Sequence, residues 1–260
     1  MTLTLTILGC GSSAGVPRPA LGWGACDPKN PKNRRRRCSL LTERAGDRGV
    51  TRILIDTSPD LREQLIDAKV DHIDAVFLTH EHADQVHGID DLRPYTLHQG
   101  AIESWADSRT FEILRRRFGY CFEAEDHSFY NPIYRHHPIE GPFKAAGVLV
   151  TPFAQDHGGT SSLGLRFGRV AYANDVVTLS EEAFEILRGA EVLIVDAMRF
   201  HPHPTHAHLD RALEWIERIR PKWAFLTNLH VDMDYAEVDR LTPAHVHPCY
   251  DGLVIETDGN

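Results

Sequence analysis

The 260-residue chain lacks the features that mark membrane-spanning, disulfide-stabilised and duplex-binding proteins. No segment approaches the roughly 20 apolar residues that a bilayer-spanning helix needs, and residues 1–9 alternate as a first strand does, not as a signal peptide. The 5 cysteines are scattered without a Cys-x-x-Cys pair, which is typical of reduced thiols. A net charge of −9 argues against a broad contact with nucleic acid. We expect a cytoplasmic protein without a membrane or stable nucleic-acid partner, and a homodimer is left open.

Strand and helix signals alternate along the chain without a linker, and 42% apolar residues suffice for a core. This alternation predicts one α/β domain over residues 1–260, with its site built from loops at strand ends. Residues 119–146 lack a clear periodicity, and we interpret them as an aromatic-lined insertion near the site. Hydrophobic patterns predict strands at 2–8, 52–56, 75–79, 147–153, 163–167, 170–173, 192–197, 223–226 and 252–256. Helices are predicted at 59–68, 108–118, 181–188 and 209–220.

The segment 79–88 is the most informative part of the chain. His80, His82 and Asp84 follow the apolar, β-favouring run 73–78, so imidazoles and a carboxylate meet at a strand end. Zn²⁺, Mn²⁺ and iron ions bind such groups and can hold a metal-bound hydroxide. A lone His-x-His would favour a histidine-rich surface loop, but the strand before it and the aspartate after it favour a metal site.

Other strand ends present groups of the same kind. His157, Asp175 and Asn228 each follow a predicted strand, and His230 lies two residues beyond Asn228. Any one of them would be interpreted as a turn or surface residue. Because four strand ends each present a candidate ligand, we expect them to form one site.

The order His80-x-His82-x-Asp84, then His157, Asp175 and a last histidine region, resembles the metallo-β-lactamase superfamily. The resemblance covers nearly the whole chain and implies an αββα sandwich fold. It also implies a first metal site of His80, His82, His157 and Asp175, and a second site that includes Asp84 and Asp175.

Three further segments resemble one branch of that superfamily. Residues 8–17, 23–24 and 34–39 are similar to the branch that holds the phosphoribosyl 1,2-cyclic phosphate phosphodiesterase, with tRNase Z a more distant relative. The resemblance implies a hydrolase that uses two divalent ions, Mn²⁺ or Zn²⁺, against a phosphodiester. Asp84 would then orient the attacking hydroxide.

The chain departs from the family pattern at three positions. Gln85 stands where the family has a histidine, and Asn228 replaces the histidine of a Leu-Thr-His motif. A carboxamide is a much weaker ligand than an imidazole, so we expect a weak second site that His230 completes, with Asn228 as the alternative ligand. Cys26 alone remains of a cysteine cluster that binds a structural zinc in the phosphonate enzyme, so we expect no such zinc.

The resemblance places His208 near the scissile phosphate. As an imidazolium it would protonate the leaving oxygen or neutralise the phosphorane. The alternative is that the run 201–208 is a histidine-rich loop that precedes the next helix, and we assign His201, His203 and His206 to that loop.

Two segments are suited to an anionic substrate. Residues 158–162 offer Ser161, Ser162 and backbone N–H groups to a phosphate. The run 34–37 ends in Arg37, whose guanidinium could pair with phosphate, although such a run is often a solvated face.

The function predicted from these residues is a metal-dependent phosphodiesterase for a small cyclic phosphate or nucleotide-like phosphodiester. One alternative is a tRNA-processing or other nuclease of the same fold. Another is a non-catalytic accessory protein that resembles the pyrroloquinoline-quinone biosynthesis relative, which Gln85 and Asn228 favour.

Overall fold

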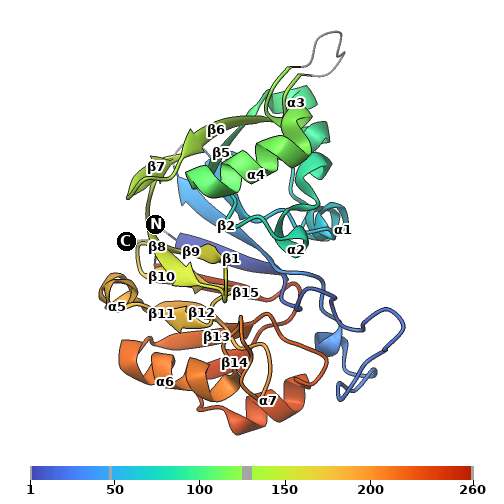
Figure 1. The fold of residues 1–260 in the computed structure, drawn as a ribbon, viewed down its shortest axis with the longest axis vertical. Coiled ribbons are helices and arrows are strands. Elements are labelled where there is room, and N and C mark those ends of the chain that lie inside the picture. Colours follow the sequence, from blue (N-terminus) through green and yellow to red (C-terminus); the bar gives the residue numbers. More distant parts are fainter. Residues whose placement is uncertain (1, 47–48, 125–130, 259–260) are drawn as a thin grey trace.

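A computed structural model describes residues 2–46, 49–124 and 131–258, and it contains two β-sheets between outer layers of helices (Figure 1). The first sheet has the strand order β15-β1-β2-β3-β4-β5-β6. These strands are β1 (Thr2–Gly9), β2 (Ser39–Gly46), β3 (Gly49–Ile55), β4 (Ala75–Phe77), β5 (Ile102–Ala106), β6 (Tyr134–Pro138) and β15 (Val254–Asp258).

The second sheet has the order β11-β8-β9-β10-β12-β13-β14. An additional strand, β7, pairs with β8 outside this order. Its strands are β7 (Phe143–Ala145), β8 (Val148–Asp156), β9 (Ser161–Phe167), β10 (Val170–Ala173), β11 (Thr178–Leu179), β12 (Val192–Asp196), β13 (Trp223–Thr227) and β14 (Val246–Pro248).

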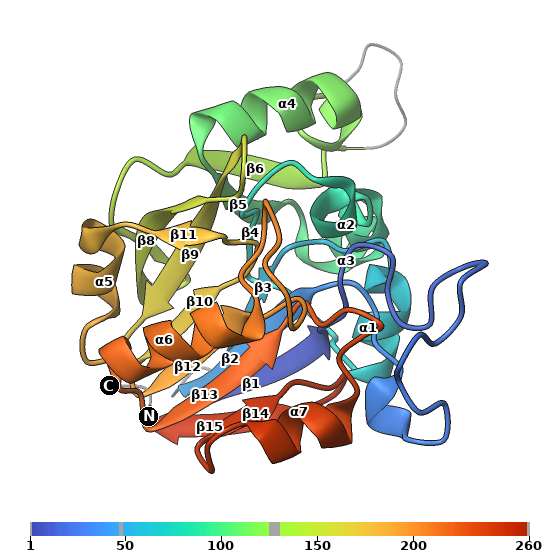
Figure 2. The ribbon, with the colours of Figure 1, turned by 60° about the horizontal axis from the view of Figure 1, so that its bottom comes forward.

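Helices cover the outer face of each sheet (Figures 1 and 2). Those on the first sheet are α1 (Leu61–Asp67), α2 (Ala83–Val86), α3 (Arg93–Gln99) and α4 (Ser108–Phe118). Those on the second are α5 (Glu181–Leu187), α6 (Leu209–Ile219) and α7 (Tyr235–Leu241), and short 3₁₀ turns occupy Pro31–Asn33, Ile89–Leu92 and Gly119–Cys121. No helix in the described part of the chain is long and apolar enough to cross a bilayer.

Alternation along the strands accounts for the layers. In β1, Leu3, Leu5 and Ile7 belong to the core between the sheets, whereas Leu8 packs in the core beneath α1. In β12, Ile194 faces the other sheet and its neighbours face α6. Each sheet therefore buries both faces, and the αββα sandwich expected from the sequence is confirmed.

The four helices predicted from the sequence all form, with ends within two residues of the expected ones. Side-chain caps explain two of the starts, because Asp107 accepts from the Thr110 N–H and Ser180 accepts from the Ala183 N–H.

The segment 119–146 contains more regular structure than its sequence suggests. Residues 125–130 lie outside the described residues, but β6 is the edge strand of the first sheet and β7 pairs with β8. This part of the expected insertion is thus built into the sheets.

Parallel pairing determines where the site lies. Strands β3 to β6 are parallel to one another, and so are β10, β12, β13 and β14. Their carboxyl ends therefore gather at common edges, and loops from both sheets meet there (Figure 2).

Candidate metal centre

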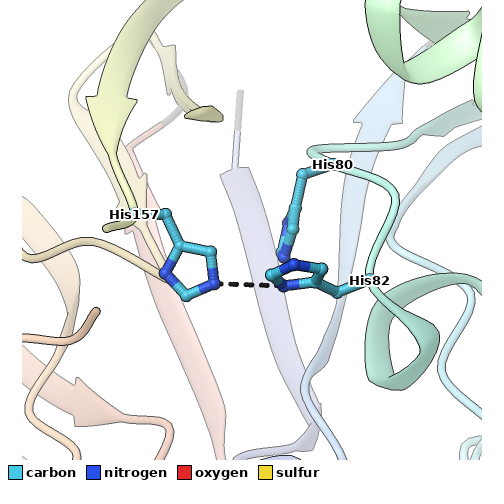
Figure 3. A group of neighbouring side chains, drawn as sticks. All are labelled: His80, His82 and His157. Carbon is cyan, nitrogen blue, oxygen red and sulfur yellow. Dashed lines mark hydrogen bonds between the residues drawn. The ribbon is translucent and has the colours of Figure 1, made fainter. Parts of the chain in front are cut away.

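Three imidazoles from two loops gather at this edge (Figure 3). His80 and His82 lie between β4 and α2, and His157 follows β8. The ring centroids are 4.7 Å apart for His80 and His82, 5.0 Å for His82 and His157, and 5.1 Å for His80 and His157. His82 Nδ1 lies 3.1 Å from His157 Nε2, a separation open to two ligands that share one ion at about 2.1 Å.

Burial of His80 and His157 favours the neutral form of these two rings, which is the form that binds metal. It lowers the pKa of His80 well below its usual value, and the neighbouring imidazoles lower it further. It also lowers the pKa of His157 to about 4. Neutral imidazole is a metal ligand, and the buried His80 Nε2 has no hydrogen-bond partner among the described residues. This donor set fits a divalent cation such as Zn²⁺ or Mn²⁺.

Hydrogen bonds on the far side of the rings orient them. The Thr79 hydroxyl donates to buried Asp56 at 2.8 Å, which leaves its oxygen to accept from His80 Nδ1 at 3.1 Å. His157 Nδ1 donates to the Thr205 carbonyl at 2.7 Å. Both rings therefore keep the Nε2 lone pair for the centre, as metal-binding histidines commonly do.

An ion pair ties the histidine loop to α4. Arg109 of α4 donates to both carboxylate oxygens of Glu81, at 2.8 and 3.3 Å, and to the Thr160 hydroxyl at 2.6 Å. Arg117 donates to the Glu81 carbonyl at 2.8 Å. Since Glu81 stands between His80 and His82, these contacts fix the loop that carries both rings.

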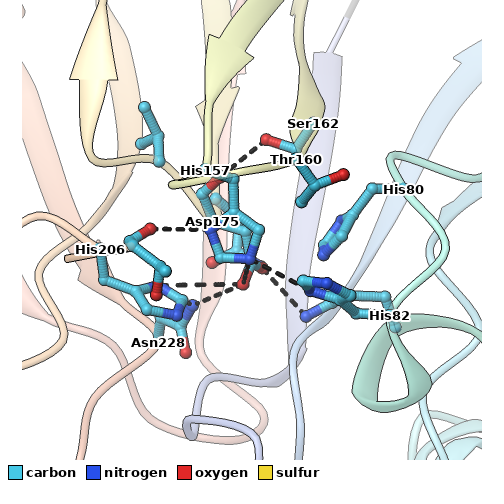
Figure 4. Close-up of polar contacts among 12 residues, drawn as sticks. His80, His82, His157, Thr160, Ser162, Asp175, His206 and Asn228 are labelled. Carbon is cyan, nitrogen blue, oxygen red and sulfur yellow. Dashed lines mark hydrogen bonds and ion pairs between the residues drawn. The ribbon is translucent and has the colours of Figure 1, made fainter.

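Asp175 lies at the middle of a second group (Figure 4). Its Oδ1 is 3.6 Å from His157 Nε2 and 3.9 Å from His206 Nδ1. These three side chains have the geometry of a metal-binding group. Burial raises the pKa of Asp175 well above its usual value, against the pull of the His206 charge.

Amide groups surround the same carboxylate. Gln85 donates to Oδ2 of Asp175 at 3.0 Å, Asn174 donates to Oδ2 at 2.6 Å, and Asn228 donates to Oδ1 at 3.3 Å. A second ion needs lone pairs at these positions, whereas the amides present N–H groups. The second group therefore fits an ion less well than the three histidines do.

His206 is held by an acid at the end of β12. Its Nδ1 lies 2.7 Å from Oδ2 of buried Asp196. Although burial opposes the charged ring, the Asp196 carboxylate raises the pKa of His206 to about 9. The ring is 4.7 Å from His157, so a stable imidazolium can stand beside the centre.

Three residues expected at the site, Asp84, His208 and His230, lie outside the two groups of candidate ligands found among the described residues. Asp84 is half-buried in the first turn of α2, and its charge acts on Asp175 and His206. His208 is the N-cap residue of α6, and His230 Nδ1 lies 2.8 Å from Asp232 Oδ2. Neither His208 nor His230 belongs to the ligand groups found among the described residues, and their roles stay predictions.

The three residues expected to bind substrate, Ser161, Ser162 and Arg37, differ in how accessible their side chains are to a ligand. Ser161 is exposed, but buried Ser162 donates to the Asp175 carbonyl at 2.7 Å. Arg37 pairs with Asp60 at 2.7 Å, and Asp60 precedes α1. Ser162 and Arg37 thus already have partners within the protein, Asp175 and Asp60, whereas Ser161 is exposed and open to a ligand.

His206 is the site residue that sequence reasoning passed over in favour of His208. Both rings belong to one histidine-rich run, and spacing alone does not rank them. The available signal was Asp196, an acid at the end of an apolar strand that needs a partner when buried.

An αββα sandwich with an imidazole cluster at its loop edge defines a class of metal-binding hydrolases. The chain belongs to the metallo-β-lactamase superfamily, because the family model described as "Beta-lactamase superfamily domain" matches residues 51–228. This confirms the resemblance seen in the sequence.

Two solved structures and one curated relative are similar to the chain. A diphosphatase from the PhnP family is 33% identical with a TM-score of 0.90, over 99% of this chain and 98% of that one. Zn²⁺-bound PqqB from Methylobacterium extorquens, at 16% identity and a TM-score of 0.76 over 97% and 99% of the chains, shows the fold alone. An octanoyltransferase of Porphyromonas gingivalis is 33% identical over 252 residues, 95% of this chain. The chain spans 50% of that relative's length.

Proposed function

We propose that this protein is a metal-dependent phosphodiesterase that acts on a small cyclic phosphate or nucleotide-like phosphodiester. The observation that carries the proposal is the cluster of His80, His82 and His157 in a chain 33% identical to a PhnP-family diphosphatase. Burial lowers the pKa of His80 and of His157 and so favours the neutral form of these two rings. A bound Mn²⁺ or Zn²⁺ would lower the pKa of water and neutralise charge on the phosphoryl oxygens.

The cation would be held by the three imidazoles, with Asp175 as the nearest carboxylate. Asp84, half-buried at the start of α2, would accept a proton from the attacking water and orient it. A second ion would find the carboxylates of Asp84 and Asp175 but no imidazole from Gln85 or Asn228, so it would be held more weakly.

His206 takes the role of proton donor in this proposal. Its pKa of about 9 keeps the ring protonated at neutral pH, and Asp196 holds it beside His157. A positioned imidazolium can give its proton to a leaving alkoxide. His208, which the sequence favoured for this role, lies two residues further along the chain, and its alanine variant is the control for the alanine variant of His206.

An open pocket of about 590 Å³, lined by residues that precede and follow His157 in the chain, would receive the rest of the substrate. Arg109, Asp156, Thr160 and Ser161 line it, so the pocket combines one guanidinium with a carboxylate and hydroxyls. Such groups suit the sugar hydroxyls and phosphate oxygens of a nucleotide-like ester.

A non-catalytic accessory role is the second candidate. The amides of Gln85 and Asn228 favour it, because they weaken the second ligand group. A pre-tRNA nuclease has less support, since the net charge of −9 disfavours a long contact with RNA.

Turnover of bis(p-nitrophenyl) phosphate by the Mn²⁺- or Zn²⁺-loaded protein tests the proposal. We expect turnover that His82→Ala abolishes together with bound metal, because an imidazole ligand is lost. A metal-loaded, folded protein that hydrolyses no phosphodiester would support the accessory role. Cleavage of pre-tRNA at a higher kcat/KM than small diesters would favour the nuclease.

A further inference from the structure

The surroundings of Asp175 bear on how many ions the centre holds. Its Oδ2 accepts from Gln85 at 3.0 Å and from Asn174 at 2.6 Å, and its Oδ1 accepts from Asn228 at 3.3 Å. Only Oδ1 also faces His157, at 3.6 Å. One oxygen of the carboxylate is thus directed at the three-histidine cluster, and the other is occupied by amide donors.

The carboxylate dictates the direction of the amide groups. If Gln85 or Asn228 were turned over, a carbonyl oxygen would face a carboxylate oxygen, which is unfavourable in a buried site. In the observed orientation Gln85 Nε2 donates to Asp175, while Gln85 Oε1 has no hydrogen-bond partner among the described residues. The contact with the carboxylate therefore sets the orientation of the amide even though its oxygen stays unpaired. The N–H groups therefore stand where a second cation would approach Asp175.

Burial prevents these amides from moving aside easily. Gln85, Asn174 and Asn228 are each at most 2% exposed. They come from α2, the end of β10 and the end of β13, so displacing them would disturb three elements. The three amide side chains are therefore buried at the edge of the core and do not form a surface cluster.

We infer that the centre binds one divalent cation, and that Gln85 and Asn228 hold Asp175 as a terminal ligand of that cation. The amide N–H groups donate to the carboxylate on the side where a bridging arrangement would need a second ion. His206 does not supply the missing ligand through Nδ1, the nitrogen that lies 3.9 Å from Asp175 Oδ1, because Asp196 engages that nitrogen at 2.7 Å. This differs from the pair of ions implied by the sequence resemblance, and it does not depend on the substrate.

Counting metal on the dialysed full-length protein tests the inference. Mass spectrometry after loading with Mn²⁺ or Zn²⁺ should give one ion per chain for the wild type. The double variant Gln85→His/Asn228→His should bind two, because each change replaces an N–H donor by an imidazole lone pair. Gln99→His, an exposed change on α3, should stay at one and controls for the added histidine.

Electron paramagnetic resonance of the Mn²⁺-loaded proteins supplies a readout independent of activity. The wild type should show isolated Mn²⁺, and the double variant should show two exchange-coupled ions. Two ions of similar affinity in the wild type would overturn the inference, and so would a folded double variant that still binds one. Should the double variant not fold, His82→Ala decides: it should retain no ion, and one retained ion would reveal an independent second site.

Discussion

The role of an individual histidine in this protein depends on the group at its second nitrogen. His157 donates to the Thr205 carbonyl and has a pKa of about 4, whereas His206 faces Asp196 and has a pKa of about 9. The two rings are 4.7 Å apart. A buried imidazole whose Nδ1 donates to a neutral carbonyl stays neutral and can bind metal, whereas one whose Nδ1 donates to a carboxylate stays charged and can act as an acid.

This contrast gives a prediction for His206. If it protonates the leaving oxygen, His206→Ala should lower kcat by about 10²–10⁴ on an alkyl or ribosyl diester. The loss should be smaller on a p-nitrophenyl ester, whose leaving group needs no proton. Steady-state kinetics on both substrates, with bound metal counted in parallel, measure that difference.

His208→Ala is the matched control, because it removes an imidazole two residues away that lies outside the ligand groups. We expect it to leave kcat on the alkyl ester within a few-fold of the wild type. A large loss in His208→Ala and none in His206→Ala would return the role to the residue favoured by the sequence.

At the scale of elements, α4 is joined to the edge strand β6 by an aromatic stack. The rings of Phe111 and His136 lie 3.5 Å apart between centroids and 8° from parallel. Burial lowers the pKa of His136 to about 4. The folded protein therefore holds this ring neutral, while the unfolded chain protonates it near its usual value of about 6.5.

The stack predicts a pH dependence of stability. Because the folded pKa is depressed, the contribution of His136 is present above about pH 6.5 and is lost progressively as the pH falls towards 4. His136→Phe should keep the stacking and reduce that slope, by on the order of 1 kcal/mol between pH 7 and 5. Urea unfolding at the two pH values measures it, and exposed His98→Phe, which should leave the slope intact, is the control.

Helix α6 gives a prediction of packing energy. Trp215 is 6% exposed and packs in the core between α6 and the second sheet. Trp215→Ala should lower the free energy of unfolding by about 3–5 kcal/mol, because it removes a large buried side chain and leaves a cavity. Denaturant titration checks this, and a loss below about 1 kcal/mol would mean that α6 is not packed as described.

At the scale of the whole molecule, the cysteines report on global unfolding. All five are free and buried, and burial raises the pKa of Cys10 and Cys38 well above the usual value. A thiol reagent should therefore label none of them quickly in the native protein and all of them in denaturant. Labelling of one thiol well before the cooperative transition would reveal local opening at that position.

The layered fold was predictable from the sequence because its signals are local. Period-two alternation in β1 and β3 and the capped pattern of α4 each depend on a few neighbouring residues. Elements without such a signal were missed, among them β2, β5 and α7. Their residues become strand or helix through pairing and packing with distant parts of the chain.

The sequence by itself determined the three-histidine cluster, since His80 and His82 share one loop and His157 follows a strand that a family pattern identifies. Only the tertiary structure decided which histidine of the run 201–208 stands beside the centre, and how Gln85 and Asn228 turn towards Asp175. The physical reason is that an imidazole or an amide takes its role from the charge and lone pairs within hydrogen-bond reach. Those partners come from strand ends that are far apart in the chain and meet only when the two sheets pack.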